Sequence, residues 1–153
     1  SYHIEKFKLG GIDCTFVQDN HVSSIKNTLR GLHFQVKHPQ AKLLRCIKGR
    51  VFDVAVDIRK KSPTYGKYVK AIINSDSFKQ ILVPIGFAHG FLTLEDNTEV
   101  IYKVSNYYSP ESERGIIWND SDINIDWSLS HSKITLLERD KTFPKLKDLE
   151  DFF

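Results

Sequence analysis

The most constraining feature of this sequence is a succession of short runs rich in Val, Ile, Phe and Tyr, separated by Gly, Pro, Asn and Asp. As far as Tyr108, no long stretch repeats its apolar residues with the 3.6-residue period of a helix. Short strands at intervals of roughly 8 to 12 residues are typical of all-β sandwiches and barrels. We therefore expect an all-β fold, and, at 153 residues, a single domain over 1–153.

Turn residues divide the runs into individual strands. The strand-like runs are 41–48, 50–59, 67–74, 79–84, 86–95 and 98–108. Gly49 falls between the first two and predicts that they form a hairpin. The less regular segment 109–135 is expected to form loops, anchored by Trp118 and Trp127.

The two ends of the chain have a different character. The first eleven residues predict a short helix stopped by Gly10 and Gly11. Residues 145–153 predict a closing helix after Pro144. No Met occurs anywhere, even at the first position, so we expect the sequence to be a processed or trimmed product.

Charge and cysteine content restrict the classes of partner. A net charge of +3 and a pI near 8.8 suit an anionic small ligand, and no dense Lys/Arg run indicates a nucleic-acid surface. Cys14 and Cys46 have no metal-site spacing, and two cysteines make no disulfide framework, so free thiols in a cytoplasmic protein are expected. No apolar run approaches the roughly 18 residues of a membrane span.

Two histidines stand in apolar surroundings. His33 follows Leu32 and precedes Phe34, so strand alternation puts it on the face opposite to both. His89 lies in "PIGFAHGF" beside apolar residues. Either one alone is more often a hydrogen-bonded structural residue, but two in one small β fold suggest a shared cavity. Without a matching carboxylate they make a poor zinc or iron site, so no metal is expected.

Other ionisable residues lie within the expected strands. Asp53 is inside an apolar run and needs a partner, because a buried unpaired charge is costly. Considered alone, Tyr102 is expected to be a core tyrosine and Asp140 a surface charge. A base such as His33, an acid of high pKa such as Tyr102, and cations such as Arg30 and Lys42 together suit proton abstraction beside a carbonyl. Spacing alone leaves open whether these side chains converge.

Five motifs in order, taken together, resemble the dTDP-4-dehydrorhamnose 3,5-epimerase family. They are "LRGLHFQ", "AKLLRCIKGRVFDVAVDIRKKSPTYGK", "QILVPIGFAHGF", "EVIYKVSNYYSPESERGIIWND" and "IDW". The resemblance implies a cupin-type jelly-roll β-barrel with short flanking helices, a homodimer, and no metal or organic cofactor. It also implies that C3 and C5 of dTDP-4-dehydro-6-deoxy-D-glucose are inverted to give dTDP-4-dehydro-L-rhamnose.

The resemblance also implies roles for individual residues. His33 would be the base, Asp140 the carboxylate that orients it, Tyr102 the acid on the opposite face of the sugar, and Lys42 the cation at the enolate oxygen. The substrate contacts implied by the motifs are Arg30, His89, Gln18, Asp19, Asn20, Glu113, Asp53, Tyr108 and Arg139. Arg139 stands where Lys is common in the family, so a point charge becomes a planar one.

The sequence departs from the family at its start. Family members carry a "D-x-R-G-x-F-x-E" stretch before the first helix, and this chain begins just after it, as an N-terminal truncation would.

Other functions are also compatible with these motifs. The alternatives to the 3,5-epimerase are an epimerase of another nucleotide-linked 4-keto sugar, or of one carbon only, and a non-catalytic sugar-nucleotide-binding cupin. A 3,4-ketoisomerase would have paired histidines on the His33 strand, and a cupin dioxygenase would need a metal.

Overall fold

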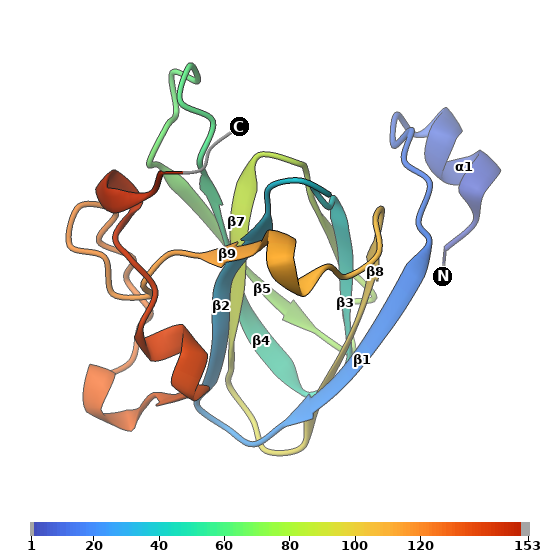
Figure 1. Ribbon diagram of the computed structural model, residues 1–153. Coiled ribbons are helices and arrows are strands. Elements are labelled where there is room, and N and C mark those ends of the chain that lie inside the picture. Colours follow the sequence, from blue (N-terminus) through green and yellow to red (C-terminus); the bar gives the residue numbers. More distant parts are fainter. Residues whose placement is uncertain (1, 151–153) are drawn as a thin grey trace.

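Two β-sheets face each other in the computed structural model, which describes residues 2–150 (Figure 1); their strands pair antiparallel except for the parallel pair β10–β2. The first sheet has the strand order β1-β8-β3-β6, with β1 (Gln18–Ser24), β8 (Thr98–Val104), β3 (Lys42–Lys48) and β6 (Gln80–Val83). The second has the order β10-β2-β7-β4-β5, with β10 (Thr135–Leu136), β2 (Thr28–Gln35), β7 (Phe87–Thr93), β4 (Arg50–Asp57) and β5 (Tyr68–Asn74). A short strand, β9 (Glu113–Gly115), also pairs with β2.

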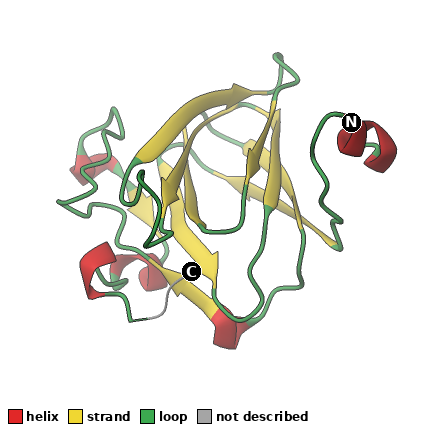
Figure 2. Cartoon of the chain, turned by 90° about the horizontal axis from the view of Figure 1, so that it is seen from above, coloured by secondary structure: helices red, strands yellow, loops and turns green. Residues whose placement is uncertain are grey.

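The strand orders 1-8-3-6 and 2-7-4-5 are those of a jelly roll, in which the chain passes repeatedly between two four-stranded sheets. The fold class predicted from the sequence, an all-β jelly-roll barrel, is therefore confirmed. Seen from above, the strands form the walls of the barrel and the helical turns stay on its periphery (Figure 2).

The predicted hairpin at Gly49 is wrong, because β3 and β4 belong to different sheets. Gly49 has φ +75°, and a Cβ there would lie 2.6 Å from the Thr98 Oγ1. Glycine alone accepts this conformation without strain and permits so close an approach. The turn was recognised correctly, but it takes the chain from one sheet to the other instead of folding it back.

Two hydrophobic cores flank the second sheet. The inner core, between the sheets, contains Leu44, Cys46, Val51, Ile73, Phe91 and Val100. The outer core packs the other face of the second sheet against residues 116–149, including Trp118 and Trp127. Trp127 Nε1 donates to the Trp118 carbonyl oxygen at 3.0 Å, so the predicted anchoring of this segment is confirmed. Because both of its faces are covered, β4 is buried from Val51 to Asp57, and most of these residues are apolar.

The helical elements are short. Helix α1 (Ile4–Leu9) ends at Gly10, as predicted, and lies to one side of the barrel in both ribbon views (Figures 1 and 2). The 3₁₀ turns are η1 (Pro110–Ser112), η2 (His131–Lys133), η3 (Glu138–Lys141) and η4 (Leu146–Asp148). The predicted closing helix is thus one 3₁₀ turn among residues 145–150, and its last three residues lie outside the described part of the chain. Cys14 and Cys46 are free thiols, as predicted.

Candidate active site

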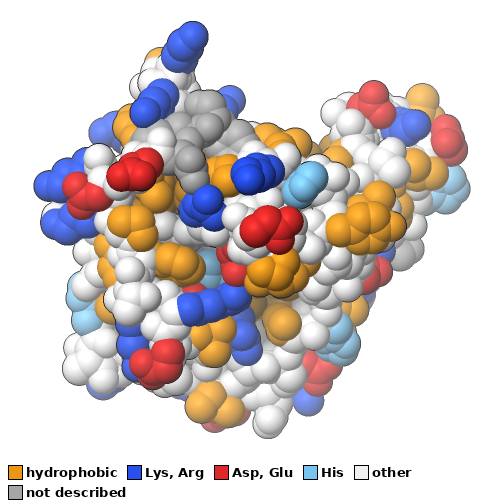
Figure 3. Space-filling model, viewed as in Figure 1, with side chains coloured by type: hydrophobic (Ala, Val, Ile, Leu, Met, Phe, Trp, Pro, Cys, Tyr) orange, Lys and Arg blue, Asp and Glu red, His pale blue; other side chains and the backbone are white. Residues whose placement is uncertain are grey.

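A cavity between the two sheets collects most of the predicted site residues. Its outer part has a volume of about 240 Å³ and is lined mainly by polar side chains from β1, β2, β3, β8, β9, η3 and the loops before β3 and η1. Its inner part, of about 80 Å³, reaches toward the inner core. Basic, acidic and histidine side chains gather around the middle of the face turned to the viewer in Figure 3.

Strand β2 carries two residues of the inner cavity, Arg30 and His33. Three residues apart on a regular strand, they would point to opposite faces. The pairing of β2 with β7 shifts register between them, however, so both side chains face inward. Gly31 permits the shift, because it has φ +130° and a Cβ there would lie 2.5 Å from the Gly90 Cα.

His33 and Asp140 form a hydrogen-bonded pair. The His33 Nε2 lies 2.8 Å from the Asp140 Oδ1, and the other carboxylate oxygen accepts from the Gly31 N–H at 3.1 Å. Asp140 is fully buried, and Phe143 packs edge-on against the imidazole ring. Burial lowers the pKa of His33, although the Asp140 carboxylate opposes this shift. A carboxylate at Nε2 holds the proton there and leaves Nδ1 with a lone pair, as a general base requires.

A second histidine–carboxylate pair lies beside the first. The His89 Nε2 is 2.9 Å from the Asp53 Oδ2, and both residues are buried. His33 and His89 are direct partners across β2 and β7. The second oxygen of Asp53 has no hydrogen-bond partner among residues 2–150. Asp53 thus lies behind His89 and orients it from outside the cavity lining.

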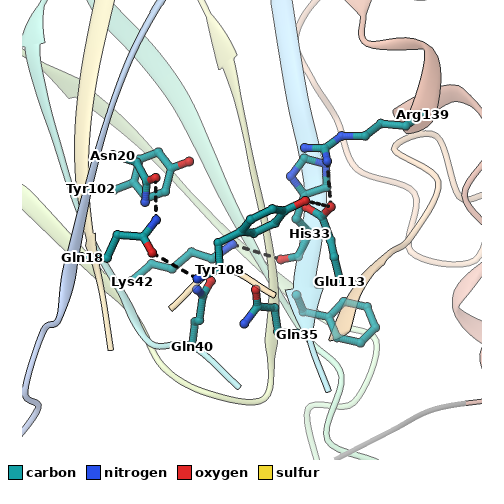
Figure 4. A pocket seen from close by; sticks show the side chains of 11 residues that line it. Gln18, Asn20, His33, Gln35, Gln40, Lys42, Tyr102, Tyr108, Glu113 and Arg139 are labelled. Atoms are coloured by element: carbon teal, nitrogen blue, oxygen red, sulfur yellow. Dashed lines mark hydrogen bonds and ion pairs between the residues drawn. The ribbon is translucent and has the colours of Figure 1, made fainter. Parts of the chain in front are cut away.

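Lys42 and Tyr102 complete the centre of the cavity. The Lys42 Nζ donates to the His33 carbonyl oxygen at 3.3 Å, and burial lowers its pKa to about 8. Burial raises the pKa of the Tyr102 phenol, so it keeps its proton at neutral pH. Figure 4 shows Tyr102 and His33 on opposite sides of the cavity, with Lys42 between them. The arrangement offers a base, an acid and a cation around one space.

The outer cavity has a wall of linked polar side chains. Glu113 Oε2 accepts from the Tyr108 hydroxyl at 2.9 Å and from the Arg139 Nη1 at 2.7 Å. Gln18 Oε1 accepts from the Tyr108 N–H at 3.1 Å, and the Gln18 Nε2 donates to Asn20 Oδ1 at 3.0 Å. This wall presents amide, phenol and guanidinium groups, which suit a polar, anionic ligand.

Comparison with known proteins identifies the family. The family model for dTDP-4-dehydrorhamnose 3,5-epimerase matches residues 1–148. A dTDP-4-dehydrorhamnose 3,5-epimerase from Salmonella typhimurium is 54% identical over 132 residues, which cover 85% of this chain and 72% of that protein. The chain belongs to the dTDP-4-dehydrorhamnose 3,5-epimerase family. The resemblance of its five motifs is thereby confirmed, and its family is one of isomerases.

Solved structures of dTDP-sugar epimerases have the same fold. The dTDP-6-deoxy-D-glucose-3,5-epimerase from Legionella pneumophila, in complex with dTDP-4-keto-L-rhamnose, superposes with a TM-score of 0.94 at 41% identity, covering 98% of this chain and 80% of that one. A 3'-monoepimerase from Streptomyces bikiniensis, in complex with dTDP-quinovose, gives a TM-score of 0.86 at 31% identity, covering 95% and 74%. The fold is therefore shared by epimerases that differ in how many carbons they invert.

Of the residues predicted from the epimerase motifs, Asp19 is not brought to the cavity. It lies between Gln18 and Asn20 on β1, so strand alternation turns it to the outer face. There its carboxylate pairs with the Lys103 Nζ at 2.7 Å and is about half exposed. The motif match selected three consecutive residues, whereas a strand presents only alternate ones to a cavity.

Several cavity residues were missed by sequence reasoning. Gln35 ends the "RGLHFQ" motif, and its side chain holds the loop that carries Tyr108: it donates to the carbonyls of His38 and Tyr107 and accepts from the Ser109 N–H. The other missed lining residues are Val22, Phe34, Gln40, Phe91 and Leu137. The apolar ones give no sequence signal, because they look like ordinary core residues.

Metal ligands and membrane spans were also sought in the described part of the chain. Among residues 2–150, no three His, Cys, Asp or Glu side chains are grouped closely enough to hold a metal ion. None of the helices in this part is both long enough and apolar enough to cross a membrane.

Proposed function

We propose that this chain is an epimerase that inverts C3 and C5 of dTDP-4-dehydro-6-deoxy-D-glucose, giving dTDP-4-dehydro-L-rhamnose, without a metal or organic cofactor. The observation that carries the proposal is the buried His33–Asp140 pair facing Tyr102 across one cavity, with Lys42 between them. Family membership and the sugar nucleotide bound by the Legionella relative support the same reaction.

The proposed reaction begins with proton removal beside the C4 ketone. The Nδ1 of His33 takes the proton from C3 or C5, and the electrons of that C–H bond form an enolate. Lys42 stabilises the negative oxygen, since with a pKa of about 8 it is mostly protonated at neutral pH. Asp140 stabilises the imidazolium that forms on His33.

Reprotonation from the opposite face inverts the carbon. Tyr102 donates its phenolic proton to the strongly basic enolate carbon, and its raised pKa keeps the phenol protonated at neutral pH until the enolate forms. His33 then loses its proton to solvent and Tyr102 regains one, so each inverted carbon carries a hydrogen from water. A second round on the other carbon completes the reaction with the same residues.

Substrate binding is assigned to the remaining cavity residues. The nucleotide and diphosphate occupy the outer cavity, where Gln18, Asn20 and Tyr108 supply polar contacts and Arg139, with Glu113, supplies the planar cation. Arg30 and His89 contact the sugar in the inner cavity, and Asp53 holds His89 in place.

We further propose that the enzyme is one cytoplasmic domain that works as a homodimer. Sedimentation equilibrium tests whether the protein is a dimer in solution.

Deuterium incorporation tests the reaction directly. In deuterated water, with dTDP-4-dehydro-6-deoxyglucose, we expect NMR to detect exchange at both C3 and C5 together with formation of the L-sugar. Exchange at C3 alone would identify a monoepimerase, the activity of the Streptomyces bikiniensis relative. Exchange at neither carbon would refute the proposal.

Two variants separate catalysis from binding alone. His33→Ala removes the base, and Tyr102→Phe removes the acid while keeping the ring in place. We expect each to lose turnover by roughly 10²-fold or more, because positioned acids and bases contribute about that much. Binding of dTDP should change little in either variant. A parent protein that binds dTDP-sugars without turnover would instead identify a sugar-nucleotide-binding module.

A further inference from the structure

The inner part of the cavity has an apolar corner that the proposed chemistry does not use. Val22, Phe91 and Leu137 line it, beside the polar residues of the reaction centre. Val22 and Phe91 pack on the inner core, whereas Leu137, just before η3, is partly exposed. The corner is therefore built from both sheets and from the C-terminal segment.

Strand register places this corner next to the reacting side chains. On β1, Asn20 pairs with Tyr102 and Val22 pairs with Val100, so Val22 is the next inward position beyond Asn20. On β7, His89 pairs with His33, and Phe91 is the next inward position beyond His89. Val22 and Phe91 thus lie one layer deeper in the barrel than the base and the acid. Leu137 approaches the same space three residues before Asp140.

The chemistry of a 4-dehydro-6-deoxyhexose suggests what this corner binds. C1, C2, C3 and C4 each carry an oxygen, whereas the C6 methyl has no polar atom. The methyl is attached to C5, a reacting carbon, so it must lie close to the base and the acid. We propose that Val22, Phe91 and Leu137 bind the C6 methyl and make the site selective for 6-deoxy sugars over sugars with a C6 hydroxyl. This inference rests on the proposed function.

A C6 hydroxyl would find few free partners in the corner. The side chains of Val22, Phe91 and Leu137 carry no polar atom, so a hydroxyl packed against them meets no donor or acceptor from these three residues. Of the nearby polar groups, the Arg30 Nε and Nη2 donate to the Ser24 Oγ at 3.1 and 3.0 Å, and the His89 Nε2 is paired with Asp53. A hydroxyl placed there gives up its hydrogen bonds to water without replacement. Apolar pockets reject an added hydroxyl by roughly 100-fold at most. We therefore expect a preference of about 10- to 100-fold for the 6-deoxy sugar.

Two stable sugar nucleotides that differ by one oxygen atom test this selectivity. Calorimetric titration of the wild-type protein should show that dTDP-6-deoxy-D-glucose binds about 10- to 100-fold more tightly than dTDP-D-glucose. Val22→Thr keeps the side-chain shape and adds a hydroxyl partner, so we expect it to reduce the preference to less than about threefold. Val69→Thr, on the exposed part of β5, is the matched control and should keep the wild-type preference.

A second variant protects the test against misfolding of Val22→Thr. Leu137→Asn changes a partly exposed loop residue to a polar one that branches at the same carbon, and should also reduce the preference. Equal binding of the two sugars by the wild type, or an unchanged preference in both variants, would overturn the inference. Deuterium exchange at C3 and C5 without any methyl preference would refute this inference alone, and methyl preference without exchange would refute only the epimerase proposal. Binding of neither sugar would overturn both.

Discussion

Replacing Asp140 with Asn tests how the buried carboxylate controls His33. Asp140 accepts two hydrogen bonds, from the His33 Nε2 and from the Gly31 N–H. An amide of the same shape offers one acceptor and one donor, so it cannot accept both. If its oxygen faced His33, the buried Gly31 N–H would be left unpaired at a cost of about 1 to 3 kcal/mol.

The opposite orientation satisfies every group but disables the base. The amide N–H then donates to the His33 Nε2, which must give up its own proton, and Nδ1 becomes protonated. The active tautomer is disfavoured by that same cost of about 1 to 3 kcal/mol, and loss of the charge-assisted bond to the imidazolium adds about 1.5 to 3 kcal/mol. Together these terms predict a fall in kcat of roughly 10²- to 10⁴-fold, similar to the effect of the equivalent change in the serine protease triad.

NMR assays of deuterium incorporation at C3 and C5 measure this fall in kcat. Binding of dTDP to the variant checks that the cavity is intact. Because the variant leaves no buried group unpaired, we expect the free energy of unfolding to change by no more than about 1 kcal/mol. Asp19→Asn is the matched control, since Asp19 pairs with Lys103 on the outer face. An Asp140→Asn variant that keeps more than a tenth of wild-type kcat would refute the tautomer argument.

Two further predictions concern pH and backbone geometry. Lys42 has a pKa of about 8 and acts in its protonated form, so kcat/KM should fall as the pH rises through about 8. Lys42→Arg should move this high-pH fall in kcat/KM to higher pH. If the fall does not move, it belongs to another group. Gly31→Ala should destabilise the fold by about 3 kcal/mol or more in thermal melts, because the added Cβ would meet the Gly90 backbone at φ +130°. Gly11 has φ +88° and open space around it, so Gly11→Ala should cost only about 1 kcal/mol. Equal losses of stability in the two variants would contradict the steric explanation.

Features with a local physical cause were predictable from the sequence. The β-rich runs, the ends of most strands and the helix stop at Gly10 follow from propensity and turn chemistry. The inward orientation of His33 follows from the alternation of side chains between Leu32 and Phe34. The pairing of His33 with Asp140 was expected only through the family resemblance, because no local pattern links residues 107 positions apart.

Other features depend on contacts between distant segments, and only the tertiary structure decided them. Gly49 marks a turn in the sequence, but whether the next strand joins the same sheet depends on the pairing of all eight barrel strands. Arg30 faces the cavity because Gly31 meets Gly90 across β2 and β7, which shifts the register of that pair. The sequence by itself determined which residue types were available and how each strand alternates; the packing of one strand on another determined which of them share a cavity.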